Sequence, residues 1–239
     1  MIKVAIIGGG NVAYHLTKAF KTSKKVEVAL FSGRDDLSKK IINIDICIIA
    51  VSDSAIVEVA KKLLDLNVLV AHTSGSVAIK NLPNKRCGVF YPLQTFSKEK
   101  KVNFNNIPIC LESNNTEDFN ILKILAGYIS NSIAAVSSEQ RRALHVAAVV
   151  ANNFSNHMFT IAEGICKEND LSFDLLKPLI LETADKIKTL DPFIAQTGPA
   201  KRHDLDTIQN HENLLKNSIH KKLYKQITQS ILNTYGQKL

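Results

Sequence analysis

The stretch "IIGGGNVAYHL" (residues 6–16) sets three glycines between an apolar run and a segment with helical spacing. Its glycines and alanine form the pattern G-x-G-x-x-A, which joins the first strand to the first helix in dinucleotide-binding folds. Gly8 permits the tight turn, and Gly10 lets the backbone approach a pyrophosphate. The free N–H groups at the start of the helix, at Asn11 and Val12, favour an anion there. A glycine-rich turn without a ligand is the alternative interpretation.

Apolar runs and amphipathic stretches alternate through the first half of the chain. The apolar runs with strand character cover residues 3–8, 26–31, 44–51 and 67–73, and shorter ones follow at 87–92, 107–113 and 131–138. Continuous apolar strands separated by amphipathic helices are typical of a parallel sheet that is covered on both faces. We therefore predict an α/β fold that begins with a Rossmann domain, a doubly wound parallel sheet.

The second half of the chain carries helical patterns and no strand pattern. Residues 138–169 read as one helix of about thirty residues, and further helices are expected at 172–190, 205–215 and 218–235. Because the character of the sequence changes near residue 136, we predict two domains. Residues 1–136 form the dinucleotide-binding domain, and residues 137–239 form an all-helical domain for substrate binding and dimerisation.

The composition of the 239-residue chain argues against several classes of protein. The formal net charge is +8, but the basic residues are spread along the sequence, so neither nucleic acid nor a membrane is expected as a partner. No apolar run reaches the roughly twenty residues of a spanning helix, and the N-terminal segment does not resemble a signal peptide. The four cysteines are far apart and form no C-x-x-C pair, which indicates reduced thiols, a cytoplasmic location and no zinc site.

The stretch "ALFSGR" (residues 29–34) lies where the second predicted strand ends. NAD sites place a carboxylate here, which accepts a hydrogen bond from the ribose 2′-OH and would repel a 2′-phosphate. The stretch offers Ser32 and Arg34 instead, and these can donate to a phosphate. We therefore predict NADP as the cofactor. Asp35 and Asp36 follow directly and could serve as ribose ligands of NAD instead.

The ends of the next two predicted strands supply further cofactor contacts, because the carboxyl ends of parallel strands meet at the ligand-binding edge. Val51 and Ser52 end the third strand and are expected along the adenosine and pyrophosphate. His72, Ser74 and Gly75 end the fourth strand and are expected near the nicotinamide. Turn chemistry alone could also explain the Ser-Gly-Ser sequence.

Four segments together resemble a known group of proteins. They are "HTSGS" (72–76), "GVFYPLQTFS" (88–97), "RRALHVAAVVANNF" (141–154) and "TGPAKRHDLDTIQNH" (197–211). The group is that of bacterial Rossmann-like NADP oxidoreductases with a C-terminal helical domain of unassigned function, within the 6-phosphogluconate dehydrogenase-like superfamily. The resemblance covers nearly the whole chain and implies the fold and an NADP cofactor, but no known substrate.

The sequence departs from the hydroxyacid dehydrogenases of that superfamily at one point. Those enzymes have a Lys and an Asn one turn apart on the first long helix, whereas His145 and Val149 occupy the comparable places here. We therefore do not expect a hydroxyacid oxidation that is carried by a lysine.

The polar side chains of the long predicted helix are candidates for catalysis. The unperturbed pKa of a histidine is near neutrality, so His145 is expected to act as the general acid. At about 100° per residue, Asn152 projects almost with His145, and Asn153 is displaced by about 80°. We predict that Asn153 takes part in catalysis and that Asn152 binds substrate. The alternative is a core histidine whose neighbouring asparagines bond across helices.

Two loops supply the other substrate candidates. Gln94 follows an apolar strand in "YPLQTF", and Arg202 in "TGPAKRHD" could bind a carboxylate or phosphate. Packing at the core edge and docking of the helical domain are the respective alternatives. Asp204, His203 and His211 do not have standard ligand spacing, so no metal site is predicted.

These observations predict an NADP(H)-dependent oxidoreductase that reduces a small carbonyl or imine compound and forms a homodimer through its helical domain. The alternative from another class is a non-catalytic NADP-binding sensor or interaction module. A polar, substrate-sized pocket at the nicotinamide position favours the enzyme, and a pocket filled by apolar side chains favours the sensor.

Overall fold

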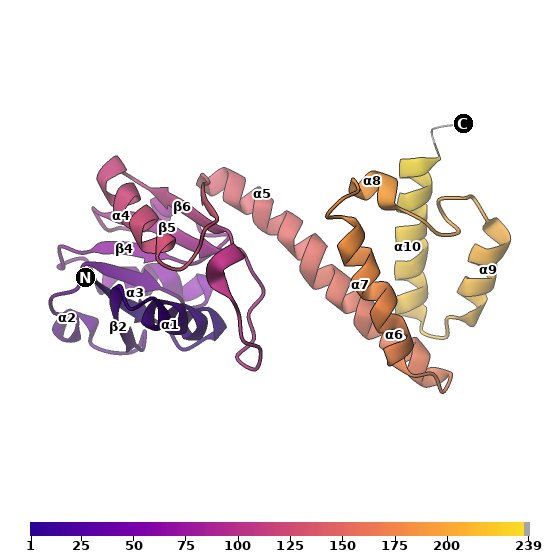
Figure 1. Cartoon of the computed structure of the whole chain (residues 1–239), viewed down its shortest axis with the longest axis horizontal. Helices are drawn as coiled ribbons and strands as arrows, with labels where there is room; N and C mark the ends of the chain where they lie inside the picture. The colour runs from indigo at the N-terminus through magenta and orange to yellow at the C-terminus, as the bar shows by residue number, and fades with distance from the viewer. Residues whose placement is uncertain (237–239) are drawn as a thin grey trace. The chain divides into compact units, whose positions relative to one another are not determined.

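The computed structural model describes residues 1–236, apart from the side chain of Ser38. Within them, seven strands form one sheet in the order β2-β1-β3-β4-β5-β6-β7. Figure 1 shows the sheet with helices beside it, and the chain continues from it into α5 (Ser138–Ala148). The strands are β1 (Ile2–Ile7), β2 (Val26–Phe31), β3 (Ile46–Ile49), β4 (Leu69–His72), β5 (Cys87–Pro92), β6 (Ile109–Ser113) and β7 (Ile133–Ala135). The predicted α/β class, a doubly wound sheet followed by helices, is confirmed.

The sheet is mostly parallel, and its last two strands run in the opposite direction to the first five. Strands β1 to β5 are parallel, whereas β6 is antiparallel to β5 and β7 runs with β6. A parallel neighbour requires a crossover, usually a helix, but the described connection from β5 to β6 has only the 3-10 turn Phe104–Asn106. The chain therefore returns beside β5 in the opposite direction.

The sheet is buried on both faces, as its continuous apolar runs predict. Residues of β1 alternate between two cores: Val4 and Ile6 belong to one, and Ala5 and Ile7 belong to the other. Helices α1 (Asn11–Ser23) and α4 (Thr116–Gly127) cover the first core, and α2 (Leu37–Lys40) and α3 (Ile56–Lys61) cover the second.

The predicted long helix is continuous but changes its winding. It consists of α5 (Ser138–Ala148), a π-helical stretch (Val149–Phe154) and α6 (Ser155–Glu168). Its start is fixed by a capping box, in which the side chains of Ser137 and Gln140 each accept from the other's backbone N–H.

The remaining helices follow α6. They are α7 (Lys177–Lys186), α8 (Pro192–Ala195), α9 (Leu205–Leu214) and α10 (Ser218–Tyr235). None of the helices in residues 1–236 is long and apolar enough to cross a membrane. The cysteines at positions 47, 87, 110 and 166 are buried and unpaired among the described residues.

The chain forms two compact units, Met1–Asn153 and Phe154–Leu239. The predicted boundary at residue 136 coincides with the change from sheet to helix, but α5 belongs to the sheet unit. Arg141 on α5 is fully buried and donates to the carbonyls of Ser74 and Val77, at 3.1 and 2.6 Å. It also pairs with Glu112 of β6, at 2.5 Å. The roles predicted for residues 137–239 remain predictions.

Candidate functional site

The glycine-rich turn follows β1 at the carboxyl edge of the sheet, next to β3, where the strand order reverses. Gly8 has φ +147°, and a Cβ atom on it would lie 2.1 Å from the carbonyl oxygen of Ala50 at the end of β3. Both the backbone conformation and the close approach of this carbonyl therefore require glycine. In a doubly wound sheet, the point where the strand order reverses is the place where ligands bind.

Gly9 and Gly10 border open space instead of another part of the chain. Gly10 has φ −79°, and a Cβ atom on either residue would meet no atom of the described residues within 4 Å. Neither the backbone conformation nor packing within the protein thus requires them. The open space lies at the N-terminus of α1, where the described first turn has neither a side-chain cap nor an acidic residue. A free helix N-terminus behind open space fits a phosphate group.

A cavity of about 430 Å³, here called the glycine-loop cavity, opens at this turn. It is lined by Gly9, Gly10, Asn11, Val12, Ala50, Val51, Ser52 and Thr73. The lining comes from the ends of β1, β3 and β4. The structure therefore brings together five predicted cofactor residues, namely Gly10, Asn11, Val12, Val51 and Ser52.

A second cavity of about 660 Å³, here called the α5 cavity, shares Asn11 and Val12 with the first. Its polar lining consists of Tyr91, Gln94, Thr95, His145, Asn152 and Asn153 together with Asn11, and its larger apolar side chains are Leu93, Phe96, Leu144 and Val149. Four residues that the sequence singled out for substrate or catalysis thus line one space. All of them belong to the sheet unit.

The π-helical stretch corrects the expected orientation of the two amides. On a regular α-helix, Asn153 would be displaced by about 80° from His145. A π-helix bonds residue i to i+5, so each residue advances less around the axis. Asn152 and Asn153 therefore both line the α5 cavity with His145.

His145 is held by two neighbours from the sheet. The Tyr91 hydroxyl lies 3.1 Å from Nδ1 of His145, and the two rings meet edge to face. On the other side, a Cβ atom on Gly75 would lie 2.6 Å from the same nitrogen. Only a glycine at position 75 therefore lets the loop after β4 pack against this ring. Burial is the main cause that raises the pKa of Tyr91, so its hydroxyl stays protonated at neutral pH.

The sequence did not indicate Tyr91, although this residue begins the segment "YPLQTF" that contains Gln94. The partner histidine is 54 residues away, and no local pattern links the two. The available signal was its position at the carboxyl end of β5, the edge at which the other candidate residues were placed.

The side chains of His72 and Ser74 accept hydrogen bonds from the backbone of the loop after β4. Nδ1 of His72 accepts from the Ser74 N–H at 3.1 Å, and Ser74 Oγ accepts from the N–H groups of Ser76 and Val77, each at 3.0 Å. Burial, reinforced by the charge of Arg141, lowers the pKa of His72 to about 3, so the imidazole is neutral. Neither side chain lines the two described cavities, so a cofactor contact at these positions would come from the backbone.

The turn after β2 leaves Arg34 exposed, whereas the carboxylate of Asp35 is already bonded within the protein. Asp35 accepts from the Ser32 N–H at 2.9 Å and pairs with Lys40 at 3.0 Å, and the Lys40 hydrogen bond is the main cause that lowers the pKa of Asp35. Arg34 is exposed and has no carboxylate within 4.0 Å in the described part of the chain. Lys62, which the sequence did not indicate, donates to the carbonyl of Gly33 at 2.8 Å.

The loop before α9 lies in the second unit. Arg202 is exposed there, and Asp204 caps α9 by accepting from the Thr207 N–H at 3.1 Å. His211 lies 2.9 Å from the Tyr224 hydroxyl. Within residues 1–236, no three His, Cys, Asp or Glu side chains are placed to hold a metal ion.

The fold and the two cavities define a doubly wound α/β protein with a helical C-terminal unit. The model of the family described as a domain of unknown function (DUF2520) matches residues 107–231, and the chain belongs to this family. The predicted resemblance to Rossmann-like NADP oxidoreductases with a C-terminal helical domain is confirmed.

Solved structures of similar proteins cover nearly the whole chain. A candidate NADP oxidoreductase from Bacteroides fragilis is 35% identical, with a TM-score of 0.88 over 97% of this chain and 98% of that one. A Thermotoga maritima protein is 20% identical, with a TM-score of 0.74 over 98% and 99% of the two chains. An imine reductase from Streptomyces aurantiacus is 9% identical, with a TM-score of 0.65 over 98% and 93%, and shows the fold alone. No curated protein matches the sequence.

Proposed function

We propose that this protein is an NADP(H)-dependent oxidoreductase that reduces a small carbonyl or imine compound. The observation that carries the proposal is that two cavities adjoin each other. The glycine-loop cavity has a free helix N-terminus, and the α5 cavity contains the Tyr91–His145 pair. They share Asn11 and Val12, so the space for a dinucleotide adjoins the space for a substrate.

The sheet unit supplies the groups that would hold the cofactor. The N–H groups at the start of α1 bind the pyrophosphate, Gly10 leaves room for it, and Val51 and Ser52 border the same cavity. When bound, NADPH supplies the hydride. The 35% identical Bacteroides fragilis protein carries the description of an NADP oxidoreductase, which supports this cofactor.

The turn after β2 favours NADP over NAD. Arg34 is free to pair with a 2′-phosphate, and Ser32 adds a hydroxyl. Asp35, the competing ribose ligand, is engaged with Lys40 and the Ser32 N–H. Lys62 adds positive charge beside the same turn.

The α5 cavity supplies the proton that reduction of a carbonyl or imine requires. His145 is the general acid, and the Tyr91 hydroxyl at its Nδ1 fixes the ring and selects the nitrogen that carries the proton. Asn153, Asn152 and Gln94 line the same cavity and orient the polar atom of the substrate. Leu93, Phe96 and Leu144 give the cavity an apolar side.

The same cavity argues against a non-catalytic sensor. In a sensor, apolar side chains would fill the pocket at the nicotinamide position. The α5 cavity instead has a volume of about 660 Å³ and several polar side chains. The test is NADPH oxidation with a panel of small aldehydes, ketones and imines, with His145→Gln as the control. Consumption with at least one compound, reduced in the variant, supports the enzyme. Tight NADPH binding with no consumption across the panel would favour the sensor.

Serine substitutions at Gly8 and Gly10 are expected to separate folding from cofactor binding. Gly8→Ser places a side chain against Ala50 at a left-handed φ and should lower the free energy of unfolding by about 1–3 kcal/mol. Gly10→Ser should keep the stability, because serine is a good N-cap, but should weaken NADPH binding by filling the open space. Denaturant unfolding and NADPH titration measure the two effects. An equal stability loss in both variants would contradict the account.

A homodimer is proposed from the apolar surface of the helices. Val146 and Val150 in the sheet unit are each more than half exposed, and so are Phe154 and Ile219 in the second unit. Exposed apolar side chains of this kind are typical of partner surfaces. We expect light scattering at micromolar concentration to give twice the 26.4 kDa of one chain, and Val150→Asp to shift it towards the monomer. A wild-type monomer at that concentration would rule the dimer out.

A further inference from the structure

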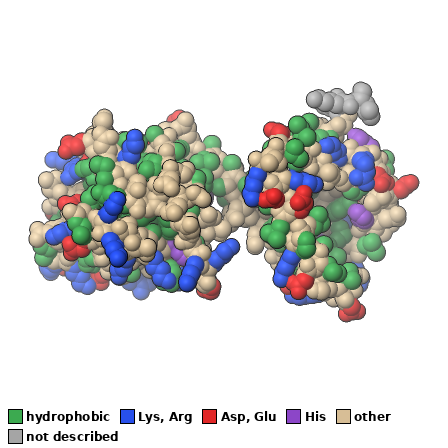
Figure 2. Space-filling view, in the orientation of Figure 1, with side chains coloured by type: hydrophobic (Ala, Val, Ile, Leu, Met, Phe, Trp, Pro, Cys, Tyr) green, Lys and Arg blue, Asp and Glu red, His purple; other side chains and the backbone are tan. Residues whose placement is uncertain are grey.

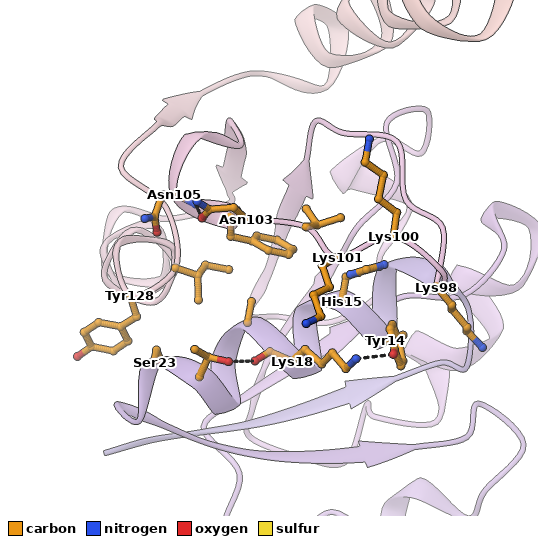
Figure 3. A pocket seen from close by; sticks show the side chains of 15 residues that line it. Tyr14, His15, Lys18, Ser23, Lys98, Lys100, Lys101, Asn103, Asn105 and Tyr128 are labelled. Carbon is orange, nitrogen blue, oxygen red and sulfur yellow. Dashed lines mark hydrogen bonds between the residues drawn. The ribbon is translucent and has the colours of Figure 1, made fainter. Parts of the chain in front are cut away.

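A third cavity, of about 420 Å³, lies beside α1 and is here called the lysine cavity. Its lining comes from α1, from residues 98–105 and from the end of α4 (Figure 3). Its described lining residues include none that line the glycine-loop cavity or the α5 cavity. The proposed reaction does not use it.

The charge of the lysine cavity is not balanced by the protein. Lys18, Lys98, Lys100 and Lys101 line it, and Figure 3 shows the side chains of Lys18 and Lys101 inside the cavity and those of Lys98 and Lys100 extending from its rim. No carboxylate is among its described lining residues, and none lies within 4.0 Å of these four amines in residues 1–236. Figure 2 shows lysine and arginine side chains gathered on this part of the sheet unit. Like charges repel, so a bound polyanion would relieve an existing cost.

Two of the four lysines, Lys18 and Lys98, are held by specific contacts. The amine of Lys18 lies 4.3 Å from the centre of the Tyr14 ring, and that of Lys98 lies 5.9 Å from the same centre. Lys98 also donates to the carbonyl of Gly9 at 3.1 Å. The electron-rich face of Tyr14 thus partly offsets two of the four charges. No hydrogen bond or ion pair of the amines of Lys100 and Lys101 is found in the described part of the chain, so these two are available to a ligand.

The backbone that carries these lysines is fixed against α1. The Asn11 side chain donates to the carbonyl of Phe96 at 2.7 Å, and buried His15 lies 2.8 Å from the carbonyl of Ser97. At the other end of the segment, Phe104 is buried in the core, and Asn103 accepts from the Asn105 N–H at 3.0 Å. A cavity with a fixed wall loses less entropy on binding than a mobile loop does.

The side of the lysine cavity away from Lys98 and Lys100 carries uncharged side chains. Figure 3 shows Tyr128, Asn103 and Asn105 away from Lys98 and Lys100. An aromatic ring and two amides suit an uncharged, hydrogen-bonding part of a ligand. A volume of about 420 Å³ is in the range of small-molecule sites.

We propose that the lysine cavity binds a small molecule that carries two or more phosphate groups, of the nucleoside diphosphate class. The phosphates lie on the lysine side of the cavity, nearest to Lys18 and Lys101, and the uncharged part lies towards Tyr128 and the two asparagines. The site shares no described lining residue with the dinucleotide site, and Lys98, which donates to the carbonyl of Gly9, reaches both. It goes beyond the proposed reduction.

The test is a calorimetric titration of ADP into the full-length protein that is saturated with NADPH. The double variant Lys100→Ala with Lys101→Ala should bind ADP about tenfold more weakly, the loss of about one charge-assisted contact. The matched control is Lys85→Ala with Lys123→Ala, because both are exposed lysines outside the cavity, and it should bind as the wild type does. Thermal unfolding should show that both variants are folded.

Several results would overturn the proposal. They are the absence of ADP binding at millimolar concentration, equal weakening in the two double variants, and complete loss of ADP binding on saturation with NADPH. Tighter binding of single-stranded RNA or anionic vesicles than of ADP, lost in the Lys100–Lys101 variant, would assign the lysines to a macromolecule instead. The Lys100–Lys101 variant distinguishes the lysine cavity from the proposed active site even without NADPH. Neither lysine lines the glycine-loop cavity or the α5 cavity. Failure of the proposed reduction would therefore leave this test intact.

Discussion

The His145→Gln variant is expected to lose about 10²–10⁴-fold in turnover while it keeps its affinity for NADPH. A positioned proton donor contributes a factor of this size, and the residues that would hold the cofactor lie in the glycine-loop cavity, which His145 does not line. Glutamine retains hydrogen-bonding groups next to the Tyr91 hydroxyl but cannot give up a proton at neutral pH. The measurement is single-turnover hydride transfer against pH, normalised to folded protein.

Two companion variants separate proton transfer from positioning. Tyr91→Phe removes the hydroxyl at Nδ1 and should shift the pH profile with a smaller loss of rate than His145→Gln. Asn153→Ala should raise KM as well, because an amide that orients the substrate also binds it before the transition state. If His145→Gln has the wild-type rate and the wild-type pH profile, His145 is a packing residue and has no part in the mechanism.

The Arg34→Ala variant is expected to lose the preference for NADPH over NADH. A guanidinium that pairs with a 2′-phosphate through two charged hydrogen bonds is worth about 10²-fold in affinity, and NADH lacks that phosphate. NADPH affinity should fall by this factor while NADH affinity changes little. Titration of both cofactors, followed by fluorescence, measures the ratio.

The matched control for Arg34 is Lys39→Ala. Lys39 is an exposed cation on the neighbouring α2, where it pairs with Asp36 at 3.0 Å, so its removal changes the local charge equally. Its variant should keep the NADPH preference. A preference that survives Arg34→Ala, or disappears in both variants, would show that general charge rather than Arg34 recognises the phosphate.

Local patterns were sufficient for most of the fold. Continuous apolar runs and the glycine motif predicted β1 to β5, and the last helix spans residues 218–235 as expected. The direction of β6 was not predictable in this way, because it depends on the path of the chain between Pro92 and Ile109 and on nothing in the strand itself. The π-helical stretch within the long helix left no signal in the apolar periodicity either.

The candidate site also has a part that local patterns predict and a part that only the folded structure shows. Gly10, Asn11 and Val12 are contiguous in sequence, so one motif was enough to place them at the glycine-loop cavity. The contact between Tyr91 and His145 joins β5 to α5, and such a contact exists only after folding. Lys62 reaches the turn after β2 for the same reason. The inward position of the His72 side chain was missed, because all four residues of β4 are buried and no alternation shows which face each side chain takes.

The central claim is that the glycine-loop cavity binds NADPH with recognition of its 2′-phosphate. Thermal unfolding of the wild-type protein with NADPH, NADP, NADH and NAD tests it most directly, because no substrate is needed. With NADPH at about 100 times its Kd, we predict a stabilisation of about 2.7 kcal/mol, and a clearly smaller one with NADH at the same concentration. No stabilisation by any of the four cofactors, or equal stabilisation by NADPH and NADH, would contradict the account.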